Sequence, residues 1–121
     1  MKDNYKLYDL EGKKILGLYN IGEDIINLLY IHKHGEDDFG YWNVEVLRSD
    51  YKDIKDEDEI IKEIFKDTHI GTKYQNEGIS SRGDLKSILK EIDDEFSFEF
   101  SFKKSKLREL IKLNEKDFYI L

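Results

Sequence analysis

The residues whose spacing best suits chemistry are His32 and His34, two positions apart in a segment that favours a strand. On a strand both imidazoles point to one face, where Asp37, Asp38 or the distant His69 would have to complete a metal site. No spacing in the chain fixes such a third ligand or the hydrogen bonds that would orient the rings. We therefore interpret the pair as a solvated strand end and expect neither a metal nor another cofactor.

Patterns for nucleophilic catalysis and phosphate binding are missing from the sequence. The chain has no cysteine, which excludes disulfides, thiolate nucleophiles and thiolate-bound metals. Ser80 and Ser81 are adjacent hydroxyls, but no Gly-x-Ser-x-Gly turn surrounds them. Neither Gly-x-x-x-x-Gly-Lys-Ser/Thr nor Gly-x-Gly-x-x-Gly occurs. We expect a binding protein rather than an enzyme.

Acidic side chains dominate the charge, since 27 acids and 20 lysines or arginines among 121 residues give a net charge of -7. Two acidic runs stand out, residues 56–59 and residues 93–95. The first lies at a predicted helix start, where acids favour the helix dipole, and the second at a helix end, where they oppose it. Because the second run opposes its own helix dipole, we consider that it forms part of a surface that faces a partner. The simpler interpretation is an ordinary solvated junction.

Five acids and three aromatic anchors are the candidate partner-binding residues. The alternative is that the aromatic rings belong to the core and the acids only keep the chain dissolved. The candidates are Asp56, Glu57, Asp58, Asp93, Asp94, Tyr41, Trp42 and Tyr74.

Nucleic-acid and membrane partners are not expected. Counterion release from phosphates requires a basic stripe, and the basic excess in residues 103–117 is explained by a solvated helix face. No apolar run approaches the roughly 20 residues of a membrane span. The start carries Asp3 and no apolar stretch, so no secretory signal is indicated and a cytoplasmic location is expected.

The first 48 residues predict an antiparallel β-meander. Alternating and apolar segments are separated by turn signals at residues 11–13, 22–24 and 35–38. Residues 25–32 are favoured as a central strand over a helix ending at Gly35. In the next strand, Trp42 shares a face with both valines of the chain.

The remainder predicts a mainly helical half, and the whole chain predicts a single α+β domain over residues 1–121. Helical spacing indicates one helix at 57–67, capped by Asp56, and another at 85–92, begun by a Ser81-x-x-Asp84 cap. Alternating phenylalanines at 96–102 indicate a strand that buries four rings. A short helix ending near Asn114 and an apolar tail, either edge strand or core plug, follow.

Residues 71–80 form a long polar stretch of the kind that is often functional. They suggest an alternative function, the binding of a small ligand or nucleotide. Its contacts would be Lys73, Asn76, Glu77, Ser80 and Arg82, with Tyr74 among them. A second alternative is a structural, self-assembling subunit, a homo-oligomer joined through the Phe-rich strand or the tail.

The favoured function is that of a small acidic intracellular protein that inhibits a basic partner macromolecule, such as a nuclease toxin. In size, acidity and α+β pattern the chain resembles bacterial immunity proteins and antitoxins as a general type. Its lysine-rich composition, without alanine or proline, is typical of AT-rich genomes and fits a gene on a mobile element. Electrostatic attraction would speed the encounter with such a partner, and aromatic anchors would supply affinity.

Overall fold

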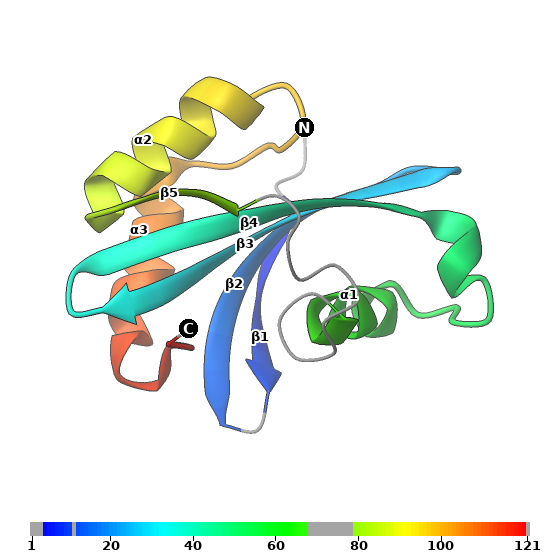
Figure 1. Ribbon diagram of the computed structural model, residues 1–121, viewed down its shortest axis with the longest axis horizontal. Coiled ribbons are helices and arrows are strands. Elements are labelled where there is room, and N and C mark those ends of the chain that lie inside the picture. Colours follow the sequence, from blue (N-terminus) through cyan, green and yellow to red (C-terminus); the bar gives the residue numbers. More distant parts are fainter. Residues whose placement is uncertain (1–3, 11, 68–78, 121) are drawn as a thin grey trace.

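A five-stranded antiparallel sheet in the order β1-β2-β3-β4-β5 forms the centre of an α+β fold (Figure 1). The structure, a computed structural model, describes residues 4–10, 12–67 and 79–120. Its elements are β1 (Tyr5–Leu10), β2 (Lys13–Ile21), β3 (Ile25–Gly35), β4 (Asp38–Leu47), the 3-10 turn η1 (Arg48–Tyr51), α1 (Glu57–Phe65), β5 (Ile79–Gly83), α2 (Leu85–Phe96), α3 (Lys104–Leu113) and the 3-10 turn η3 (Glu115–Asp117).

The predicted meander is confirmed, and residues 25–32 are a central strand. β3 pairs with β2 on one side and with β4 on the other. It is apolar on both faces because both faces are covered by helices. Leu29 and Ile31 pack in one core cluster, whereas Leu28 and Tyr30 pack in the other.

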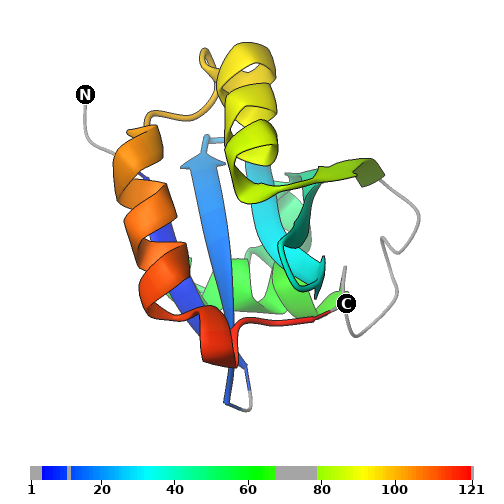
Figure 2. The same ribbon diagram turned by 90° about the vertical axis from the view of Figure 1, so that its left-hand side faces the viewer.

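The helices cover the two faces of the sheet separately. α2 and α3 lie side by side on one face, and α1 lies on the other (Figures 1 and 2). The two helical layers are also displaced along the sheet, so that α2 and α3 lie toward the β3–β4 turn and α1 toward the opposite end (Figure 1). This displacement leaves the end of the sheet at the β2–β3 turn without a described helix on its α2–α3 face.

The starts of α1 and α2 are fixed by aspartates. Asp56 caps α1 by accepting a hydrogen bond from the backbone N–H of Asp58 at 3.0 Å. Asp84 caps α2 by accepting from the N–H of Ser87 at 2.8 Å, and this bond holds the pKa of its carboxyl below the usual value. The Ser81 cap predicted from the sequence is wrong, since residue 81 lies within β5.

The predicted Phe-rich strand does not exist. Phe96 is the last residue of α2, and the N–H groups of both Glu99 and Phe100 donate to its carbonyl, so the chain continues for one helix-like turn. Phe96 and Phe100 therefore face the same core, with ring centroids 6.2 Å apart, while Phe98 points away into solvent. Aromatic residues at alternate positions are compatible both with a strand and with this i, i+4 pairing. The sequence pattern alone therefore does not distinguish a strand from a helix-like turn.

The C-terminal tail is a core plug. It lies between β2 and β3 where they diverge: the N–H of Tyr119 donates to the carbonyl of Lys14, and its carbonyl accepts from the N–H of Lys33. Phe118 packs into the core under α2 and α3, and Tyr119 packs against Phe65 on the α1 face. The tail thus contributes one ring to each core.

Gly17 is a position where a Cβ would be crowded by two tyrosine rings. A Cβ there would lie 3.1 Å from Cε2 of Tyr8 and 3.2 Å from Cε1 of Tyr30. Both rings are buried, so a Cβ at this position would have to displace a packed side chain by a few tenths of an ångström. Gly17→Ala is expected to lower the free energy of unfolding by about 1–3 kcal/mol, measured by urea denaturation.

Gly35→Ala is the matched control for this prediction. It adds the same methyl group to β3 at a point where nothing lies within 4 Å. We expect it to change the free energy of unfolding by no more than about 0.5 kcal/mol. Equal losses in the two variants would show that backbone effects, rather than the tyrosine contacts, set the cost.

Candidate docking surface

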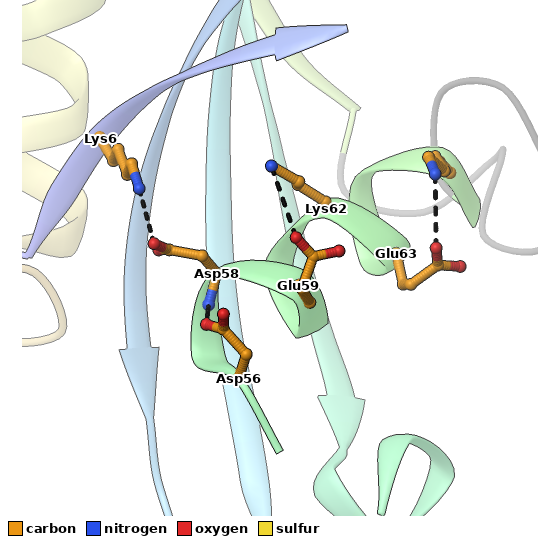
Figure 3. Close-up of polar contacts among 7 residues, drawn as sticks. Lys6, Asp56, Asp58, Glu59, Lys62 and Glu63 are labelled. Carbon is orange, nitrogen blue, oxygen red and sulfur yellow. Dashed lines mark hydrogen bonds and ion pairs between the residues drawn. The ribbon is translucent and has the colours of Figure 1, made fainter. Parts of the chain in front are cut away.

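The acids predicted at the start of α1 are occupied within the chain (Figure 3). Asp56 caps the helix, and Asp58 forms an ion pair with Lys6 of β1 at 2.6 Å. The next turns repeat the arrangement, with Glu59 pairing with a lysine at i+3 and Glu63 doing the same. Of the three α1 acids proposed to bind a partner, only Glu57 has no such contact among the described residues.

The acids at the end of α2 are also used internally, which explains why they oppose their own helix dipole. Asp94 pairs with Lys90 at 2.9 Å, and Asp93 pairs with Lys104 at the start of α3 at 3.4 Å. Glu95 accepts a hydrogen bond from the hydroxyl of Tyr41 at 3.3 Å. The negative end of α2 thus meets the basic start of α3, and no external partner is needed to explain the run.

The two acidic runs do not form one surface. α1 and α2 lie on opposite faces of the sheet, which separates them (Figure 1). A flat partner surface therefore cannot contact both runs at once.

Two of the three predicted aromatic anchors are core residues. Tyr41 and Trp42 are 2% and 5% exposed. Tyr41 packs under α2 against Phe96, and Trp42 lies on the other face beside His32. Their burial follows from adjacent positions on a strand whose faces are both covered. The third anchor, Tyr74, lies outside the described residues.

The alternative ligand site is described only at its end. Lys73, Asn76 and Glu77 lie outside the described residues, and Ser80 is placed only as a backbone position of β5. Arg82 is exposed and forms an ion pair with Asp38 across the β4–β5 pairing.

The histidine pair lies together, but the prediction of a solvated strand end is wrong for His32. Its ring is buried and lies 4.8 Å from that of His34, centroid to centroid. Gly40 sits opposite His32 in the register and leaves room for both rings. Burial lowers the pKa of His32 to about 3. In the described ranges no three His, Asp or Glu side chains gather as metal ligands would.

Among the described residues, no helix covers the part of the sheet beyond α2 and α3 on the α2–α3 face, and we call this part the open sheet surface. Its side chains share the face that carries the α2–α3 core, because they continue the same alternation along each strand. The open sheet surface consists of Asn20, Ile25, Asn27, Asn43, Glu45 and Leu47.

Large apolar side chains are exposed on and beside this surface. Ile25 and Leu47 are direct cross-strand partners and are 40% and 56% exposed. Phe98 is fully exposed in the α2–α3 connection. That connection borders the surface, since the carbonyl of Glu99 accepts a hydrogen bond from the amide of Asn20 at 3.3 Å. Exposed apolar side chains grouped in this way are typical of interaction sites.

The rim of the open sheet surface is mainly acidic. Beside Leu47 a depression of about 430 Å³ is lined by two acids, Glu23 and Asp24, and by two basic residues. Glu45 lies on the surface itself, and Glu99 borders it. None of these four carboxylates forms an ion pair with another described residue, in contrast to Asp58 of α1 and to Asp93 and Asp94 of α2.

Sequence reasoning missed this surface, although a signal for it exists. In β2, β3 and β4 the apolar series that feeds the α2–α3 core stops at an asparagine, namely Asn20, Asn27 and Asn43. Asn20 and Asn27 are direct cross-strand partners. The asparagines thus mark the line where the covering helices end.

Comparison with known proteins assigns neither a family nor a function to the chain. No family model, no curated protein and no solved structure matches the chain. In the part of the chain that the structure describes, no helix is both long enough and apolar enough to cross a bilayer.

Proposed function

We propose that this protein is a non-catalytic, cytoplasmic binding protein that neutralises a basic protein partner, in the manner of an immunity protein or antitoxin. The partner binds the open sheet surface rather than the acidic runs at the helix ends. One observation carries the proposal: Ile25, Leu47 and Phe98 are exposed at one end of the sheet, within a rim of carboxylates free of described ion pairs.

The apolar side chains would supply the affinity. Covering an exposed Ile, Leu or Phe side chain contributes about 1.5–3 kcal/mol if its contact surface is fully removed from water. Interfaces concentrate their energy in a few such central residues, surrounded by polar side chains that exclude water. The asparagines beside Ile25 and Leu47 are suited to the second role.

The carboxylates would select a basic partner. Glu23, Asp24, Glu45 and Glu99 are part of the acidic excess that gives the chain its net charge of -7. Charges at an interface rim mainly raise the association rate and reject partners of like charge, and salt screens both effects. Raising the salt concentration should therefore weaken the complex mainly by slowing its formation.

The test begins with a photo-crosslinking residue at position 98 in the intact chain, expressed in its native cytoplasm. The crosslinked protein is identified, purified and titrated against the wild-type chain. We expect a basic protein that loses its activity when bound. Ile25→Ser combined with Leu47→Ser is expected to weaken the complex about 100-fold, which corresponds to about 2.8 kcal/mol.

Leu113→Ser is the matched control, because Leu113 is an exposed leucine of α3 outside the open sheet surface. It should leave the affinity unchanged. A partner that binds the double variant normally, but is released by reversing Asp56, Glu57 and Asp58 to lysine, would show that the α1 acids are the docking site.

Self-assembly retains less support than the sequence suggested. The Phe-rich segment is not a strand, and the tail packs within its own sheet. Sedimentation at increasing protein concentration would detect self-association through any surface.

A further inference from the structure

A basic groove runs between α2 and α3, away from the open sheet surface. It has a volume of about 400 Å³ and is lined by Lys86, Leu89, Lys90, Lys104, Ser105 and Arg108. Four of these six residues are cationic, in a chain whose net charge is negative. Cationic residues from two helices thus line one depression.

The four cations differ in their contacts. Lys90 and Lys104 are held at the edge of the groove by Asp94 and Asp93. Lys86 and Arg108 are exposed and form no ion pair with any described residue. Their positive charge is available to a ligand.

The start of α3 adds to the positive potential. Its cap residue, Lys103, makes no side-chain cap hydrogen bond, and the first turn contains no acid. Cations at the positive end of a helix dipole are unfavourable for the helix. Asp93 offsets the charge of Lys104, and a bound anion would offset the remaining cations. The dipole and the side chains therefore favour the same kind of ligand.

The walls of the groove are largely apolar between the charged groups. Most of the apolar wall comes from the methylene stems of the long cationic residues, whose charged ends reach water, and Leu89 adds the small part of its side chain that is exposed. A ligand that matches both features carries phosphate groups together with a flat apolar ring. The volume lies within the lower part of the range found for small-molecule sites.

We infer that the α2–α3 groove binds a phosphate-bearing small molecule with a planar ring, the chemistry of a nucleotide. The phosphates contact Arg108 and Lys86, and the ring lies against Leu89 and the lysine stems. This site does not depend on the docking function proposed above, and it differs from the ligand site that residues 71–82 suggested.

Titration calorimetry with ADP, pyrophosphate and adenosine tests the inference. ADP is expected to bind at least about tenfold more tightly than pyrophosphate or adenosine, since only ADP uses both features of the groove. Lys86→Ala combined with Arg108→Ala is expected to weaken ADP binding by about tenfold or more. Both residues are exposed, so the variant should keep the wild-type circular dichroism and melting temperature.

Lys106→Ala combined with Lys116→Ala is the matched control, because it removes the same charge from exposed positions outside the groove. It should leave ADP binding unchanged. Equal weakening in both double variants, equal binding of pyrophosphate and ADP, or binding of a single-stranded oligonucleotide without binding of ADP would each overturn the inference. The Ile25→Ser, Leu47→Ser variant should bind ADP normally, which separates this site from the docking surface.

Discussion

Phe118→Ala is expected to lower the free energy of unfolding by about 3–5 kcal/mol, the largest effect we expect from one substitution. Phe118 is 1% exposed and packs edge-on against Phe39, with centroids 6.4 Å apart. The backbone bonds of Tyr119 to β2 and β3 hold the tail in place, so the core cannot easily collapse into the space left by the ring. Urea denaturation measures the change.

Ile120→Ala provides the control for this prediction, because Ile120 lies on the same tail but is mostly exposed. We expect it to change the free energy of unfolding by no more than about 0.5 kcal/mol. A loss below about 1 kcal/mol for Phe118→Ala would mean that the tail is not a plug and that other side chains fill its place.

Acidification from about pH 7.5 to about pH 5 is expected to lower the free energy of unfolding by about 2 kcal/mol through His32 alone. Burial lowers the pKa of His32 to about 3 in the folded state, against about 6.5 in the unfolded chain. Between these values the unfolded chain binds the proton and the folded chain does not. The contribution of neutral His32 to the free energy of unfolding is therefore complete above about pH 6.5, and it is lost as the pH falls toward 3.

His32→Leu tests this assignment, because leucine is apolar and does not titrate. The variant should lose about 2 kcal/mol less than the wild type over the same pH range, whatever its stability at neutral pH. His34→Gln is the comparison: His34 is only partly buried, and burial lowers its pKa as well. An unchanged pH dependence in His32→Leu would show that other groups cause the acid sensitivity.

Local patterns predicted most of the elements correctly. Alternation in residues 5–47 specified four strands, and the spacing of Leu85, Ile88 and Ile92 specified α2. These predictions succeed because each strand or helix must bury the face that its own residues make apolar. The same reasoning failed at Phe96–Phe102, where rings at alternate positions also fit one helical turn, with Phe98 exposed between a partly buried Phe96 and a buried Phe100.

The candidate site was harder to predict than the fold. Acidic runs are visible in a sequence, but their internal partners are not. Asp58 meets Lys6 from a strand 52 residues away, and Asp93 meets Lys104 across the α2–α3 connection. Glu45, which forms no ion pair with a described residue, stands alone in the sequence and attracts no notice.

The sequence by itself determined that this chain forms an antiparallel meander with amphipathic helices, has no thiol chemistry and carries excess negative charge. Only the tertiary structure decided which helix covers which part of the sheet, and therefore which apolar side chains stay exposed. The reason is that exposure and ion pairing depend on neighbours that are distant in the chain. Three asparagines mark this boundary in the sequence, because they lie where the sheet extends beyond α2 and α3: Asn20, Asn27 and Asn43.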